Sequence, residues 1–185
     1  VSELTNWQDQ GLFTDVAVHV GTLLAVIIYL RNHILSLIKN FLLFKVDNNK
    51  NLINIFIATL PAVIVGYFIL DIVQNYFRDL RVVATTSIVF AALLFLADHF
   101  KVKTSRWENM SYFQAFIIGL FQILAFIPGA SRAGVTITGA RLLGFDRTSA
   151  AIFSMLLSIP IIFASLVLTS VDLMNSSLPN INLYQ

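Results

Sequence analysis

Long stretches without any charged residue dominate this chain. They cover 16–30, 51–70, 82–97, 109–131 and 148–171. A helix needs about 20 apolar residues, within a range of about 17–25, to cross the hydrocarbon core of a bilayer. The stretches 16–30 and 82–97 reach this length only with flanking residues whose charged ends extend to the interface. The pattern predicts an all-α polytopic membrane protein, folded as a single transmembrane domain over residues 1–185.

Composition excludes the main alternative classes. Of the 185 residues, 57% are apolar and 12% are charged, whereas a soluble domain has about 45–50% and about 25%. Disordered chains are much less hydrophobic than this one. The absence of cysteine excludes a disulfide framework and thiolate chemistry. The net charge of +2 gives no reason to expect a nucleic-acid partner.

The uncharged stretches and their breaks predict where the helices lie. We expect helices at about 14–31, 51–73, 81–98 and 148–171, and a re-entrant helix-loop-helix hairpin at 112–144. A basic, partly amphipathic stretch follows the first helix. The chain starts with Val1 rather than methionine, and its start has neither the basic nor the apolar part of a signal peptide. Its last residues, NINLYQ, do not form a closing element. We therefore expect the chain to be a fragment of a longer protein.

Basic residues in the links predict the orientation in the membrane. The link 31–51 has four, 98–108 has three, and 71–81 has two that are offset by two aspartates. By the positive-inside rule, 31–51 and 98–108 are cytoplasmic. Arg141 and Arg147 favour the same side for the end of the hairpin. Both ends then lie on one side, which makes the hairpin re-entrant, although a full crossing by its first arm stays open.

The tip of this hairpin reads PGASRAG, from Pro128 to Gly134. Pro128 ends the incoming helix, and Gly129 permits a tight turn. Ser131 stands where the outgoing helix needs an N-cap. The first N–H groups of that helix lack internal partners and carry the positive end of its dipole, which favours an anion. Arg132 adds a planar cation whose donors suit phosphate oxygens.

We therefore predict a phosphate-binding site at the tip. Its catalytic residues are Arg132 and Ser131, and its substrate-binding residues are Gly129, Ala130, Gly134 and Thr136; no metal ligand is expected in this chain. The structural alternative is that Ser131 only caps a helix and Arg132 reaches a lipid headgroup. Arg132 comes 24 residues after the preceding charge, Glu108, and an ionisable residue at such depth indicates function.

Polar residues elsewhere in the apolar segments suggest structural roles. Gln114 and Gln122 are eight residues apart, on one helical face, and predict hydrogen bonds between helices. Ser154 and Ser158 are four residues apart and indicate close helix packing. Asp98 is expected at a helix end, at the membrane interface.

Three stretches of the chain, including the hairpin tip, resemble the undecaprenyl-diphosphatase family, the membrane phosphatases linked to bacitracin resistance. The resemblance rests on DVAVHVGTLLAVIIYLR (15–31), TLPAVIVG (59–66) and FQILAFIPGASRAGVTITGARLLGFDRTSAAIFSMLLSIPIIFASL (121–166). It covers nearly the whole chain in order, and the tip is its most specific part. The usual family form has serine where Ala133 stands, so one hydroxyl is missing from this tip.

The resemblance implies a function and a place in the cell. The family removes the terminal phosphate of undecaprenyl diphosphate, which recycles the lipid carrier of cell-wall synthesis. It implies a multi-pass protein of the bacterial plasma membrane whose active site opens to the outer face. It also implies an inverted repeat with two re-entrant hairpins. The expected partners are a polyprenyl diphosphate lipid and membrane lipid, and a homodimer stays open.

The first hairpin of the family carries an acidic motif of the form E-G-x-x-E-F-L-P-V-S-S-T-G-H, which has no counterpart in these residues. The family's last helices are also expected to lie beyond Gln185. The resemblance therefore implies a divalent cation, Mg²⁺ or Ca²⁺, with ligands outside this chain, and an inactive fragment. The alternative function is a transporter or flippase of polyprenyl phosphate or another anion. A purely structural subunit would leave Arg132 unexplained.

Overall fold

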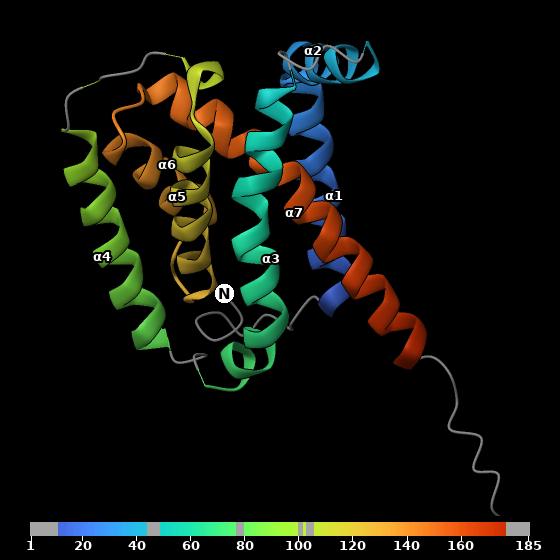
Figure 1. Cartoon of the computed structure of the whole chain (residues 1–185). Helices are drawn as coiled ribbons and strands as arrows, with labels where there is room; N and C mark the ends of the chain where they lie inside the picture. The colour runs from blue at the N-terminus through green and yellow to red at the C-terminus, as the bar shows by residue number, and fades with distance from the viewer. Residues whose placement is uncertain (1–10, 44–48, 77–79, 100–101, 103–105, 177–185) are drawn as a thin grey trace, which may run out of the picture. The chain divides into compact units, whose positions relative to one another are not determined.

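The computed structural model describes residues 11–43, 49–76, 80–99, 102 and 106–176 (Figure 1). Every regular element of these residues is a helix, which confirms the predicted all-α class for this part of the chain. The α-helices are α1 (Gly11–Tyr29), α2 (Arg31–Leu42), α3 (Lys50–Tyr76), α4 (Leu80–Asp98), α5 (Tyr112–Ile123), α6 (Arg132–Leu142) and α7 (Arg147–Ser176). Two short 3₁₀ helices, η2 (Trp107–Asn109) and η3 (Leu124–Phe126), precede and follow α5.

Three of these helices are long and apolar enough to cross a membrane. They contain the candidate spans Lys50–Phe68, Arg81–Asp98 and Arg147–Val167, and a fourth is added if α1 and α2 are counted as one span. The protein is therefore a multi-pass membrane protein. The basic stretch after the first predicted helix forms a helix of its own, α2, and α7 continues past the predicted end near 171.

Contacts within the chain divide it into two compact units. One unit is Val1–Tyr29 with Ser158–Gln185, and it contains α1 and the second half of α7. The other unit is Leu30–Leu157, and it contains α2 to α6 and the start of α7. All residues of the predicted phosphate site belong to this second unit.

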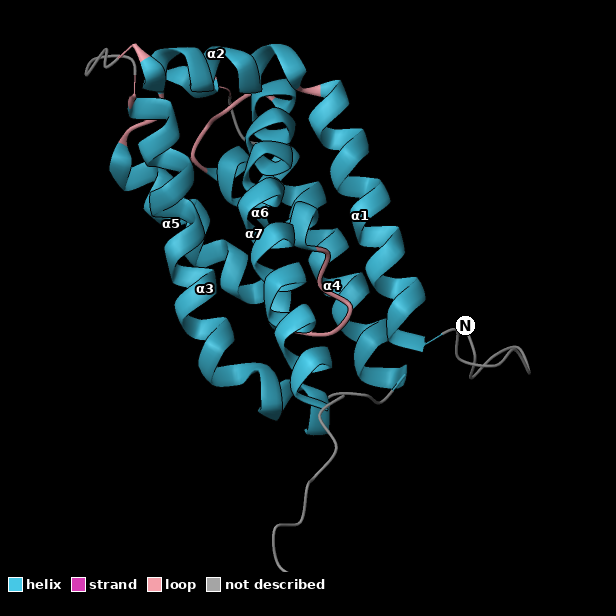
Figure 2. Ribbon diagram, turned by 90° about the vertical axis from the view of Figure 1, so that its right-hand side faces the viewer, coloured by secondary structure: helices cyan, strands magenta, loops and turns pink. Residues whose placement is uncertain are grey.

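In the second unit, α5 and α6 form a helical hairpin between α3 and α4 (Figures 1 and 2). α3 and α5 run in the same direction, because Asn54 Nδ2 donates to the carbonyl of Met110 at 2.9 Å and Gly66 lies against the ring of Phe126. A Cβ atom on Gly119 would come within 2.7 Å of the Ala58 carbonyl oxygen. Small residues thus allow the close approach of α3 and α5.

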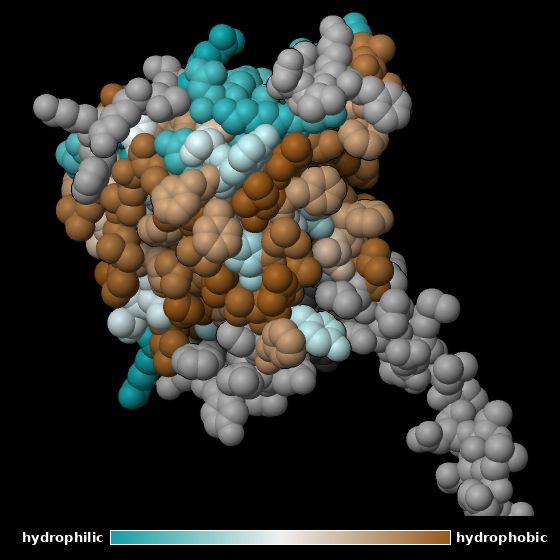
Figure 3. All heavy atoms as spheres, viewed as in Figure 1, coloured by the Kyte–Doolittle hydropathy of each residue, from teal (hydrophilic) through white to brown (hydrophobic). Residues whose placement is uncertain are grey.

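The two outer helices of this group are covered to different extents. The α3 span is 39% buried, but the α4 span is only 6% buried. Large apolar side chains of α4 face outward, including Ile88 at 70% and Phe95 at 66% exposure. Figure 3 shows apolar side chains over most of the face it displays, with hydrophilic ones at the end near η2. Such a surface is suited to lipid rather than to water.

Candidate functional site

The hairpin tip is built on a tight turn. The N–H of Ala130 donates to the carbonyl of Ile127 at 3.0 Å, with Pro128 and Gly129 as the two central residues. Gly129 has a φ angle of +90°. Proline followed by a residue with positive φ defines a type II turn, in which the second position favours glycine. The predicted tight turn is therefore present, and proline and glycine occupy the places that this turn requires.

Two hydroxyl groups of α4 hold this turn. Thr86 Oγ1 donates to the carbonyl of Pro128, and Ser87 Oγ lies 3.1 Å from the carbonyl of Gly129. Both hydroxyls also lie within hydrogen-bond distance of carbonyls of their own helix, Ser87 Oγ at 2.7 Å from that of Val83. A Cβ atom on Gly129 would collide with the Thr86 hydroxyl and with the carbonyl of Val83. Glycine is thus required here by both the backbone conformation and the lack of space. We name Thr86 and Ser87 the hydroxyl clasp.

The outgoing arm α6 begins directly after the turn. Ser131 is its N-cap, with extended backbone (ψ 125°), and Ser131 Oγ accepts a hydrogen bond from the N–H of Gly134 at 3.3 Å. This is the cap that the sequence predicts. Ser131 is exposed, and Ala130, Arg132 and Gly134 are partly exposed. These predicted site residues therefore lie together at an accessible helix N-terminus, where an anion is stabilised.

Thr136 has a different environment from the other predicted site residues. Its side chain is only 2% exposed. Its hydroxyl hydrogen-bonds Ser154 Oγ of α7 at 2.7 Å and lies 3.0 Å from the carbonyl of Arg132. Thr136 thus joins α6 to α7, and direct contact of its hydroxyl with a phosphate stays a prediction.

The base of the hairpin is held by charge. Asp98, the last residue of α4, forms ion pairs with Arg141 at 3.1 Å and with Arg147. Arg141 also donates to the backbone carbonyls of Asp98 and Phe145, at 2.6 Å each. Arg141 is only 4% exposed, whereas Arg147 is 78% exposed. We name Asp98, Arg141 and Arg147 the charged base.

Local signals in the sequence end and start the helices at this base. Gly144 has a φ of +90°, the N–H of Phe145 donates to the carbonyl of Ala140, and the N–H of Gly144 donates to that of Arg141. These two bonds form a Schellman motif, which ends a helix at a glycine. Asp146 Oδ1 then accepts from the N–H of Ser149 at 2.7 Å and caps the start of α7.

Sequence reasoning missed two features of the hairpin. The hydroxyl clasp was not singled out, although Thr85, Thr86 and Ser87 form a run of hydroxyl residues within an apolar helix. Gln114 does not bond another helix as predicted. It forms a capping box with Ser111, in which each side chain accepts from the other's backbone N–H, at 2.9 and 3.2 Å. The pattern S-x-x-Q before an apolar run was the available signal.

Gln122 is buried but makes no hydrogen bond to another helix within the described residues, so its predicted role is wrong, whereas Ser154 is buried beside a neighbouring helix as its spacing predicted. Gln122 is 2% exposed, and neither atom of its amide has a hydrogen-bond partner within the described residues. Ser154 is 7% exposed and bonds Thr136 between α6 and α7. Ser154 is therefore packed against a neighbouring helix, as predicted, and it also forms a hydrogen bond between the two helices.

The described residues do not by themselves fit a divalent metal ion. No group of three or more histidine, cysteine, aspartate or glutamate side chains gathers anywhere in the part of the chain that the structure describes. The carboxylate of Asp98, at the hairpin base, is already paired with two arginines. The hairpin tip instead offers hydrogen-bond donors that suit an anion. These are the first N–H groups of α6, the hydroxyl of Ser131 and the guanidinium of Arg132.

Comparison with known proteins identifies the family of the chain. The family described as bacitracin resistance protein BacA matches residues 1–183. An undecaprenyl-diphosphatase from Saccharophagus degradans is 48% identical over 167 residues, which are 88% of this chain and 63% of that relative. The chain thus spans less than two thirds of the length of this relative. Because the match covers nearly all of its residues, the chain belongs to the bacitracin resistance protein BacA family.

Proposed function

We propose that this chain supplies part of the active site of a membrane enzyme that hydrolyses undecaprenyl diphosphate to undecaprenyl phosphate and phosphate. The relative named above carries this activity in its name. The observation that carries the proposal is the accessible N-terminus of α6, where Ser131 is the cap and Arg132 the first helical residue. The polyprenyl diphosphate lipid is the substrate, and the product recycles the carrier of cell-wall synthesis.

The tip acts on the terminal phosphate through charge and position. In the reaction an oxygen nucleophile attacks the terminal phosphorus, the bridging P–O bond breaks, and undecaprenyl phosphate leaves. Phosphoryl transfer depends mainly on positioning and on stabilising negative charge. Arg132 and the first N–H groups of α6 supply positive potential for the phosphoryl oxygens. The hydroxyl clasp fixes the turn beforehand, so that these donors need little rearrangement during the reaction.

The hairpin is proposed to be re-entrant. Its base lies beside Asp98 at the end of the α4 span, and its tip lies beside Val83 near the start of that span. With the basic links on the cytoplasmic side, the tip is directed toward the outer face of the plasma membrane. This supports an active site open to the outside, within an inverted repeat whose other hairpin supplies the acidic motif.

The proposal includes a divalent cation, Mg²⁺ or Ca²⁺, whose ligands lie outside these 185 residues. The cation would supply further neutralisation of the diphosphate. The chain's own residues bind and orient the phosphate. The 185-residue chain alone is therefore expected to release no phosphate, and a longer form with the family's acidic motif is expected to release it.

The test is phosphate release from undecaprenyl diphosphate in detergent by that longer form. Arg132→Ala is expected to lower kcat about 100- to 1000-fold, the usual cost of removing one donor to a developing negative charge. Arg132→Lys recovers only part, because an ammonium lacks the planar pair of donors. Arg106→Gln is the matched control, since it removes an exposed arginine just before η2, away from the tip and the charged base. Full activity of Arg132→Ala would overturn the assignment.

The same assay distinguishes hydrolysis from the alternative function, which is transport. A transporter or flippase needs an anion site but no hydrolysis. If neither form releases phosphate while the longer form moves polyprenyl phosphate between the leaflets of a vesicle, the tip serves transport. Activity of the 185-residue chain alone would place the nucleophile among its own residues.

A further inference from the structure

Helix α2 separates its exposed side chains into an apolar and a polar stripe. Leu35, Ile38, Phe41 and Leu42 follow the three- and four-residue spacing of one helical face and are 48–67% exposed. Asn32, Ser36 and Lys39 form a neighbouring polar stripe and are also exposed. The helix contains two basic residues, Arg31 and Lys39, and no acidic residue. We call the four apolar residues the α2 stripe.

The inner side of α2 is already covered by protein. Leu30, at its start, and Leu37 are 2% and 9% exposed. His33 packs edge-on against Trp107 of η2, with ring centroids 6.1 Å apart. Trp107 in turn contacts Phe153 of α7. These contacts fix how α2 is rotated about its axis and keep the α2 stripe directed away from the rest of the unit.

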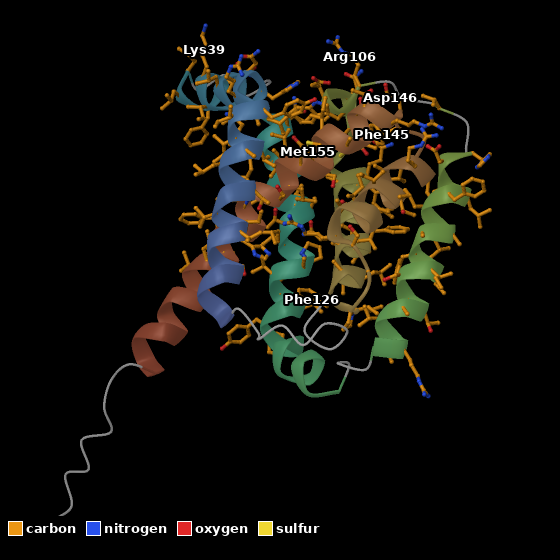
Figure 4. All side chains as sticks on the ribbon, turned by 180° about the vertical axis from the view of Figure 1, so that it is seen from behind. Lys39, Arg106, Phe126, Phe145, Asp146 and Met155 are labelled. Carbon is orange, nitrogen blue, oxygen red and sulfur yellow. The ribbon has the colours of Figure 1, made fainter. Side chains whose placement is uncertain are left out.

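α2 also lies across the direction of α3, in the same unit. In both views it crosses the N-terminal end of α3 rather than running along it (Figures 1 and 2). This end is where the α3 span begins, at Lys50, and where the α4 span stops, at Asp98. Lys39 and Arg106 point away from the helices at this end, and Phe126 lies near the opposite end (Figure 4). This placement is the one expected of a helix that lies along a membrane surface.

We propose that α2 is an interfacial helix that binds anionic phospholipid. The α2 stripe enters the boundary between headgroups and acyl chains, and Lys39 remains among the headgroups. A helix with this segregation and a basic polar side lies in the interface, and basic residues there favour anionic lipids. The inference concerns the leaflet next to the hairpin base and is independent of the chemistry proposed for the tip.

Because the chain has no cysteine, single labelling sites can be introduced without background. Ile38→Cys and Phe41→Cys place a spin label on the α2 stripe, and Ser36→Cys places one on the polar stripe as the matched control. In phosphatidylcholine vesicles containing phosphatidylglycerol, the labels at 38 and 41 should collide several-fold more with oxygen, which concentrates in lipid, than with an aqueous nickel complex. The label at 36 should show the reverse preference.

Three results would overturn the proposal. Equal access of the nickel complex to all three labels would mean that α2 stays in water. Bilayer-depth values at all three would make α2 part of a span. Shielding of 38 and 41 from both reagents would mean that protein, such as a second copy, covers the stripe.

Lipid selectivity is tested by quenching a fluorophore at Phe41→Cys with labelled phosphatidylglycerol and, separately, labelled phosphatidylcholine. One basic residue near an anionic surface is worth up to about a fivefold preference. Lys39→Gln should therefore reduce the preference for phosphatidylglycerol up to about fivefold, and Lys39→Arg should keep it. Arg81→Gln, at the other end of α4, is the charge-matched control. An unchanged preference in Lys39→Gln would remove the anionic lipid from the proposal.

Discussion

The two ends of the hairpin are attached to the same helix, α4, by different chemistry. At the tip, the neutral hydroxyls of Thr86 and Ser87 lie within hydrogen-bond distance of two backbone carbonyls. At the base, Asp98 pairs with Arg141 and Arg147. A buried charge that loses its partner is far more costly than a lost neutral hydrogen bond. We therefore expect the base to contribute more to the stability of the fold than the hydrogen bonds at the tip.

The largest loss of stability is expected when the charged base is broken. Asp98→Asn removes the charge that compensates buried Arg141 while keeping the shape of the side chain. The midpoint of thermal unfolding in detergent should fall further than for any tip substitution. The double variant Asp98→Asn/Arg141→Met should recover much of the loss, because the buried charge is then gone as well. A single variant as stable as the original would show that the base is not the anchor.

Next in size is Gly129→Ala at the tip. The added methyl group meets Thr86 and Val83, and the φ of +90° is unfavourable for alanine. Strain of this kind costs about 1–3 kcal/mol, so phosphate release should fall by about fivefold to about 150-fold while the fold persists. Gly21→Ala is the control, since a Cβ there meets nothing within 4 Å. If Gly129→Ala and Gly21→Ala release phosphate equally fast, the turn is not constrained as described.

The hydroxyl clasp allows a smaller and cleaner test. Thr86→Val keeps the shape of the side chain but removes the donor to Pro128, at a cost of about 1 kcal/mol. We expect kcat to fall severalfold with little change in KM, because the turn becomes less ordered. Thr85→Val is the neighbouring control, since the Thr85 hydroxyl bonds Arg81 of its own helix. Equal effects of the two substitutions would assign the loss to α4 itself.

The smallest expected effects come from a matched pair of helix caps. Ser131→Ala at the tip and Ser111→Ala at the base each remove an N-cap, worth about 1 kcal/mol. Their effects on the free energy of unfolding should be similar. Only Ser131→Ala should also slow phosphate release, because its hydroxyl belongs to the proposed site. Equal activity of the two variants would limit Ser131 to capping.

Features that depend on neighbouring residues were predictable from the sequence. The turn at Pro128 and Gly129 and the cap at Ser131 involve bonds over three residues. The hydroxyl clasp and the charged base join residues 42 to 49 positions apart. A single sequence shows which of these side chains can hydrogen-bond or form ion pairs, but not which of them lie together in the fold. Asp98 was therefore identified as a helix end, without its two arginine partners. Gln114 was misread because an S-x-x-Q cap was taken for contact between helices.

The position of the hairpin between α3 and α4 also bears on how the protein is made. Both flanking helices precede the hairpin in the chain, and synthesis runs at about 5–20 residues per second. α3 and α4 therefore leave the ribosome seconds before the 12 residues of α5 and the 11 of α6. Arms this short, with polar groups at the tip, are poor candidates for insertion alone. α3 and α4 can already be in the membrane when α5 and α6 are made, so that the hairpin can pack between them. The order of synthesis then matches the order of packing.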